Sequence, residues 1–321
     1  MPEVKVNLFA DYQRLAGEWA RSNALSGNLK IKGVGKQQDR AEPWLQEHSF
    51  EAAMENMHQR IEPRPRKVLV SRDFIVPDEH KGEVETIMEI ARSGGDLTQY
   101  LGNNIRKLGA SDMMLNIWGI SHFHMKPFAQ RVEGEDDELL FAHITDDTFF
   151  VVGFGGHADL KDTRFIKTLQ SNFPETLQRW RCDDEATIDI DSPDYVRLCE
   201  NNVNVVVSIN GIAYYSPGGG VNTNSNSTTS YCETVAMRRR LDIASEALEQ
   251  GFLDGIEQLS KGYVEKIKFS SINLNFIGFQ NDEILVECPE LGLKVSYRDR
   301  TGEMAVVCEN ARCGKENVHD A

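Results

Sequence analysis

Residues 111–160 contain three consecutive strand-like segments, and this tract constrains the fold more than any other part of the chain. Apolar and polar residues alternate in 114–125 and in 139–145, and an apolar run follows in 148–154. A period of two is typical of strands, because successive strand side chains point to opposite faces of a sheet. The Asp146–Asp147 pair predicts a tight turn between the second and third segments. We therefore predict three neighbouring antiparallel strands.

The segments on either side of this tract predict an α+β fold. Alternation in 67–75 indicates a strand, and helical spacing follows in 81–93 and from Asp96 to about residue 108. A further helix is predicted to begin at Asp162. This order of elements favours an antiparallel sheet with a helical hairpin, the helices lying against one face.

The flanking regions predict two further domains, in keeping with a length of 321 residues. Residues 1–62 have helical spacing and are expected to form a helical N-terminal extension, and residues 63–180 form the central histidine-rich domain. Residues 181–321 are expected to form a C-terminal α+β domain with a hairpin, a long helix and a β-meander. Asn210–Gly211 is the strongest hairpin signal, because this turn needs positive φ at both central residues.

Charge and composition limit the functional classes. The net charge of −15 disfavours a general nucleic-acid binder, because backbone phosphates are bound mainly by lysine and arginine. Residues 1–110 are balanced, with 16 basic and 16 acidic side chains. No apolar run approaches the ~20 residues of a membrane helix, so no membrane contact is expected. The six cysteines lack the spacing of a disulfide framework, which favours a cytoplasmic location.

Four histidines in the central tract are the candidate catalytic residues: His122, His124, His143 and His157. His122 and His124 are two apart on one predicted strand and therefore project to the same side. Imidazole titrates near neutrality, so such a cluster suits general acid–base cleavage of a phosphodiester. The same rings are equally compatible with a metal site that includes Asp146 or Asp159, or with hydrogen-bonded structural histidines.

Weaker motifs point to other sites. The His-x-His pair followed by Glu133 and His157 resembles a cupin metal site, although the spacing differs. The glycine-rich segments 153–156 and 218–220 could bind a phosphate through their backbone amides, and the alternative is that they form turns. Cys308 and Cys313, with Cys288 and His319, have approximate zinc-ligand content.

The central tract, with FAHITDDTFFVVGFGGHADL at its centre, resembles the RelE/ParE/HigB-type toxin domain over residues 67–179. Many members of that family are ribonucleases. Gly156–His157 matches the Gly-His step after the last strand, and Arg106 and Lys107 match basic residues on the second helix. The resemblance implies RNA as substrate, with these two cations as phosphate contacts. Ala158 stands where the family has a basic residue.

The sequence thus leads to a hypothesis of a toxin-like or defence-type effector that cleaves RNA through the four histidines, without metal or cofactor. It predicts that His124→Ala or His157→Ala abolishes cleavage. The competing hypothesis is a non-enzymatic interaction or sensor module, whose C-terminal domain binds a protein partner such as an antitoxin-like chain or a complex subunit. A histidine-ligated metal protein is the third hypothesis.

Overall fold

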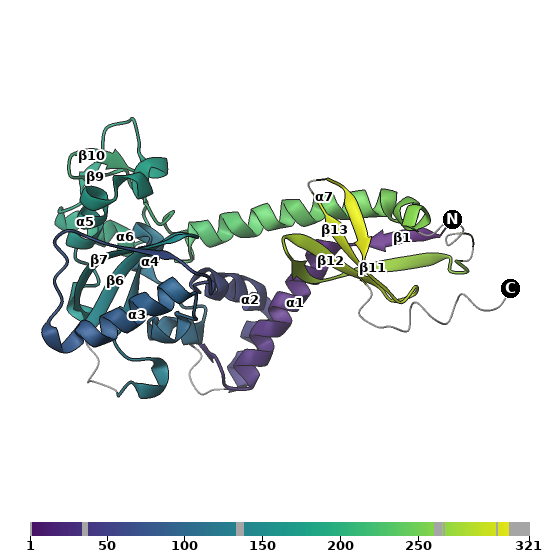
Figure 1. Cartoon of the computed structure of the whole chain (residues 1–321), viewed down its shortest axis with the longest axis horizontal. Coiled ribbons are helices and arrows are strands. Elements are labelled where there is room, and N and C mark those ends of the chain that lie inside the picture. The colour runs from purple at the N-terminus through teal and green to yellow at the C-terminus, as the bar shows by residue number, and fades with distance from the viewer. Residues whose placement is uncertain are drawn as a thin grey trace. The chain divides into compact units, whose positions relative to one another are not determined.

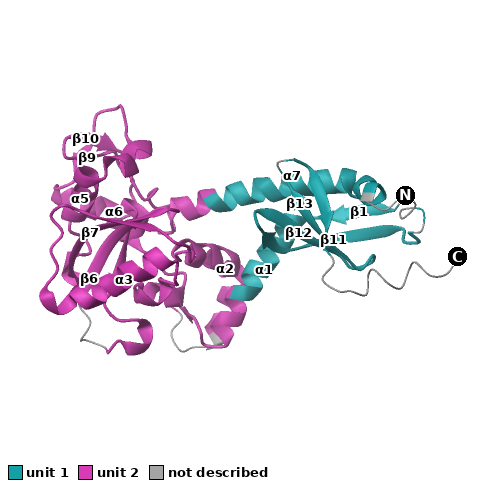
Figure 2. Ribbon diagram, in the orientation of Figure 1, with its two compact units in different colours: residues 1–19, 233–321 teal, residues 20–232 magenta. Residues whose placement is uncertain are grey.

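The computed structural model describes residues 2–33, 38–132, 138–259, 265, 267–299 and 301–307 (Figure 1). The chain forms two compact units. Unit 1 combines residues 1–19 with 233–321, and unit 2 consists of residues 20–232 (Figure 2). Each unit contains helices and a mainly antiparallel sheet, so the predicted α+β class is confirmed.

Unit 1 is built on a five-stranded sheet in the order β1-β11-β12-β13-β14. β1 pairs with β11 in parallel, and the other neighbours form the predicted antiparallel meander. The strands are β1 (Glu3–Val6), β11 (Ser271–Gln280), β12 (Glu283–Cys288), β13 (Leu293–Arg298) and β14 (Glu303–Val306).

Two helices pack on one face of this sheet, namely parts of α1 (Leu8–Leu25) and α7 (Thr228–Leu259). The ring of Tyr12 in α1 meets Phe276 in β11 edge to face, with 5.8 Å between centroids. Gly255 in α7 lies so close to Met304 in β14 that a Cβ atom would fall 1.8 Å from the methionine methyl group. The glycine therefore permits the helix to approach the sheet.

The division into units differs from the expected boundaries after residues 62 and 180. Residues 3–6 form a strand that pairs with β11, so the first 19 residues belong with the C-terminal meander. The predicted hairpin belongs to unit 2, because β9 (Val207–Ile209) pairs with β8 (Ile188–Asp189) as well as with β10 (Ile212–Tyr214). Both differences come from pairing between strands that are distant in sequence, which the composition along the chain does not indicate.

The main sheet of unit 2 has four strands in the order β3-β7-β6-β5. β5 (Ile120–His124), β6 (Glu138–Ile144) and β7 (Thr148–Gly156) are the predicted antiparallel strands, and β3 (Lys67–Val70) pairs with β7 in parallel. A separate pair joins β2 (Lys30–Ile31) to β4 (Lys107–Leu108).

The helices of unit 2 cover both faces of the main sheet, which corrects the expectation of a single covered face. Phe123, Phe149 and Val151 belong to the core that includes α3. Phe141 and Phe150 point to the other side, into the core that includes α4, α5 and α6. The helices within unit 2 are α2 (Gln38–His58), α3 (Lys81–Ser93), α4 (Met113–Trp118), α5 (Arg164–Asn172) and α6 (Pro193–Glu200), with 3-10 segments η1 (Asp78–His80), η2 (Thr98–Tyr100), η3 (Asn103–Arg106), η4 (Phe128–Gln130), η5 (His157–Asp159) and η6 (Pro174–Trp180).

Two local predictions were wrong. Residues 113–118 form α4 instead of continuing the strand, because Asp112 caps the helix by accepting a hydrogen bond from the Leu115 amide and Gly119 ends it with a φ of 70°. The helix predicted from Asp96 is replaced by η2 and η3, because Leu101 between them forms a β-bridge with Phe123. The Asn210–Gly211 turn has positive φ at both residues and is confirmed.

Candidate active site

The histidine cluster lies at one end of the main sheet of unit 2. Strand β5 places His122 and His124 on the same face, as the alternation predicted, with ring centroids 6.2 Å apart. His157 follows β7, and its ring centroid lies 5.1 Å from that of His124. β6 lies between these two strands, so three strands are needed to bring the rings together.

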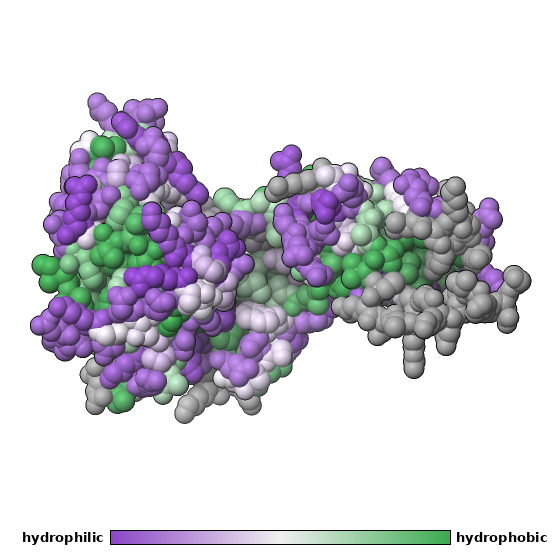
Figure 3. All heavy atoms as spheres, in the orientation of Figure 1, coloured by the Kyte–Doolittle hydropathy of each residue, from purple (hydrophilic) through white to green (hydrophobic). Residues whose placement is uncertain are grey.

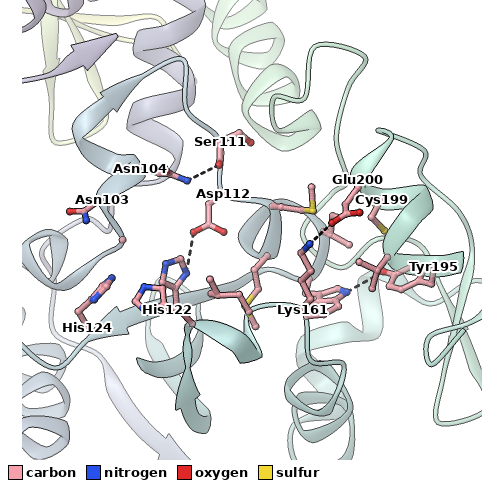
Figure 4. Close-up of a pocket in the computed structure, with 18 residues that line it drawn as sticks. Asn103, Asn104, Ser111, Asp112, His122, His124, Lys161, Tyr195, Cys199 and Glu200 are labelled. Atoms are coloured by element: carbon pink, nitrogen blue, oxygen red, sulfur yellow. Dashed lines mark hydrogen bonds and ion pairs between the residues drawn. The ribbon is translucent and has the colours of Figure 1, made fainter. Parts of the chain in front are cut away.

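The three rings line a cavity of about 460 Å³, which is within the usual size of small-molecule sites. The remaining walls come from the segment before α4, from α4 itself, from the residues after η5 and from α6. Figure 4 shows Asn103, His122 and His124 on one side of the cavity, and Tyr195, Cys199 and Glu200 on the other.

Asp112 fixes the position of His122. One carboxylate oxygen caps α4, and the other lies 3.3 Å from Nδ1 of His122 (Figure 4). Nδ1 of His122 has no hydrogen-bond partner among the described residues, and its contact with Asp112 becomes an ion pair only when the ring is protonated. The opposite ring nitrogen approaches the backbone at Gly102, where a Cβ atom would lie 2.5 Å from Nε2. Any larger residue at position 102 would therefore displace the ring.

His124 is the most buried of the three, with 4% of its surface exposed. Burial lowers the pKa of His124 to about 3, and the positive charge of Arg131 and the neighbouring rings of His122 and His157 act in the same direction. The ring is therefore neutral at neutral pH. It accepts or donates hydrogen bonds there, but it does not serve as an imidazolium.

His143 does not join the cluster. It is opposite Ile120 in the β5–β6 register, whereas His124 is opposite Leu139, so the two histidines share a face but lie toward opposite ends of the strand pair. Nδ1 of His143 is 2.7 Å from the Gly119 carbonyl oxygen. Burial lowers the pKa of His143, whose side chain is half-buried. His143 thus makes a hydrogen bond of the kind that the structural interpretation expects.

The two predicted phosphate contacts also lie outside the cavity lining. The Arg106 guanidinium stacks 5.3 Å from the Phe128 ring, which Arg131 also contacts at 4.4 Å. Lys107 belongs to β4 and pairs with Lys30. Among the described residues that line the cavity, the one lysine or arginine is Lys161, which forms an ion pair with Glu200.

Several lining residues were missed from sequence. Trp118 Nε1 donates to the Tyr195 hydroxyl at 3.1 Å, which joins α4 to α6 across 77 positions of sequence. Burial raises the pKa of Tyr195 and that of Cys199, so both remain protonated at neutral pH. Asp112 was the one member with a local signal, because Asp before an apolar run is typical of a helix cap.

The glycine-rich segments have structural roles. The amides of Gly218 and Gly220 donate to the carbonyl oxygens of Ile117 and Asn116 and are not free to hold phosphate. In β7, a Cβ atom at Gly153 would lie 2.5 Å from the Phe165 ring, so this glycine admits α5.

No group of three or more His, Cys, Asp or Glu in the described part of the chain is arranged to hold a metal ion. Asp159 accepts a hydrogen bond from the Gly156 amide and pairs with Arg164, and Asp146 pairs with Arg64. The ligand candidates Glu133, Cys308, Cys313 and His319 lie outside the described residues.

Comparison with protein-family models, with curated proteins and with solved structures gives no match to this chain. Within the residues that the structure describes, no helix combines the length and the apolar character needed to cross a bilayer.

Proposed function

We propose that the histidine cavity cleaves RNA by general acid–base catalysis. The observation that carries the proposal is the meeting of His122, His124 and His157 in one cavity of ligand size. The reaction needs two proton transfers, which one neutral histidine acting as base and one protonated histidine acting as acid can provide.

Cleavage proceeds by transesterification. The ribose 2′-oxygen forms a bond to phosphorus as the bond from phosphorus to the 5′-oxygen of the next nucleotide breaks. One imidazole accepts the proton of the 2′-hydroxyl, and an imidazolium donates a proton to the departing 5′-oxygen. The products are a 2′,3′-cyclic phosphate and a 5′-hydroxyl.

The contacts and the exposure of each histidine ring decide which ring acts as the base and which as the acid. His122 is the base, because the Asp112 carboxylate 3.3 Å away stabilises the imidazolium that forms when it accepts a proton. His157 is exposed and serves as the acid. His124 lies next to both rings and stays neutral, so we assign it no proton donation at neutral pH.

The test is incubation of the full chain with end-labelled single-stranded RNA, followed by analysis of the product ends. We expect cyclic phosphate ends and persistence of cleavage in chelator. His122→Ala and His157→Ala should each lower the rate about 100-fold or more. His48→Ala is the matched control, because that side chain is 46% exposed and lies outside the cavity.

Lack of cleavage by the unaltered chain, or full activity in both cavity variants, would overturn the proposal. Loss of cleavage in chelator would favour the metal hypothesis instead.

A further inference from the structure

Most of the cavity wall beyond the histidines is apolar. Met114, Ile117 and Trp118 come from α4, and Tyr195 and Val196 come from α6. Figure 4 shows Tyr195 on the side of the cavity away from His124. The cavity thus has a histidine end and an apolar half.

This apolar half is held open by its own structure. The Trp118–Tyr195 hydrogen bond joins the two helices that form the walls, and both side chains are at most 5% exposed. A wall built from two buried aromatic side chains with a satisfied hydrogen bond has little freedom to collapse into the space. The space is therefore present before any ligand arrives.

The charges around the cavity are nearly balanced. Asp112 faces His122, and Glu200 pairs with Lys161. A chain with a net charge of −15 and a single lysine at this lining gains little from backbone phosphates. Binding energy for a nucleotide must come mainly from its base.

We infer that the apolar half of the cavity binds one unpaired nucleobase, which makes single-stranded RNA the substrate class. The inference rests on the proposed function, because cleavage by the histidines requires the scissile phosphate to lie at the histidine end of the cavity. Proteins that read single strands commonly bury or stack an unstacked base, whereas RNA duplexes are recognised mostly through shape and backbone contacts.

Binding is tested without cleavage. The four nucleoside 3′-monophosphates are titrated into the full chain by calorimetry, and at least one is expected to bind. Met113→Trp, at a lining position that is 37% exposed, should place an indole in the space and weaken this binding about tenfold or more. Val196→Trp is the second filling variant. Val203→Trp, outside the lining and 41% exposed, is the matched control and should bind normally.

Cleavage is tested with three RNAs: a single strand, the same strand in a duplex, and single strands in which one ribose lacks its base. The base-free ribose keeps its 2′-hydroxyl, so the bond change remains feasible. We expect the single strand to be cut, and the duplex and the base-free site to be cut at least tenfold more slowly.

The two proposals fail in different ways. Nucleotide binding that the filling variants weaken, without any cleavage, would support the base site and overturn the cleavage proposal. Equal cleavage of all three RNAs, or no binding of any nucleotide, would overturn the base site even if His122→Ala were inactive.

Discussion

The sheets of the two units are covered differently. In unit 1, Ile272, Leu274 and Phe276 of β11 are buried under helices, whereas Ile277 on the same strand is 38% exposed. In unit 2, all five residues from Thr148 to Val152 of β7 are buried, because helices cover both faces. A second covering layer is what allows unit 2 to enclose a cavity beside its sheet.

Chemistry-bearing side chains follow the same division. Every histidine among the described residues lies in unit 2. Apolar side chains also reach the surface of the chain (Figure 3), and in unit 1 they include Val235, Ile243 and Phe269. The described histidines are thus confined to unit 2, and the exposed apolar side chains named for unit 1 lie on α7 and in the segment before β11.

The largest expected difference between the sheets is in core stability. Phe141 in β6 is fully buried and stacks on Phe165 with 3.9 Å between centroids. Phe141→Ala should lower the free energy of unfolding by about 3–5 kcal/mol. Phe279→Ala in unit 1 removes a side chain that is 37% exposed and should cost much less. Urea unfolding of both variants measures the two losses in the free energy of unfolding. Equal losses would contradict the expected difference between the sheets.

The next effect is the dependence of stability on pH. The unfolded chain protonates His124 near pH 6.5, whereas the folded chain holds its pKa at about 3. Between these values the unfolded chain binds the extra proton, so stability falls as the pH drops, by at most ~1.4 kcal/mol per pH unit from this group. This contribution does not vary with pH above about 7.

His124→Gln tests the origin of this slope. Urea midpoints between pH 4 and pH 7 should vary less steeply in the variant than in the unaltered chain. His143 contributes in the same direction, because burial also lowers its pKa, so part of the slope should remain. An identical slope in both proteins would show that His124 is protonated in the folded state.

The smallest stability effect is expected at two carboxylates that each accept a hydrogen bond from a backbone amide. Asp112 in unit 2 accepts the Leu115 amide and faces His122, whereas Asp11 in unit 1 accepts the Phe276 amide. Asp112→Asn keeps a helix cap but loses the charge, so stability should change by only a few tenths of a kcal/mol. RNA cleavage should fall roughly tenfold or more because His122 loses its ionic partner. Asp11→Asn should leave cleavage unchanged, and a similar loss in both variants would contradict the assignment.

Local sequence patterns predicted the elements better than their grouping. The alternation in 139–145 and the turn at Asn210–Gly211 correspond to β6 and to the β9–β10 hairpin, because strand period and turn geometry depend on adjacent residues. The expected strand over 114–125 began too early, because the Asp112 cap and Gly119 favoured a short helix that apolar spacing did not reveal.

The same limit applies to the site. That His122 and His124 share a side was determined by the sequence, since they are two apart on a strand. That His157 joins them and His143 does not was decided by the tertiary structure, through the register of β5, β6 and β7. The α6 wall, which meets α4 through Tyr195 and Trp118, was likewise decided there. Such contacts join residues far apart in the chain, and only packing of the complete core selects one register and one set of neighbours from the many that local patterns allow.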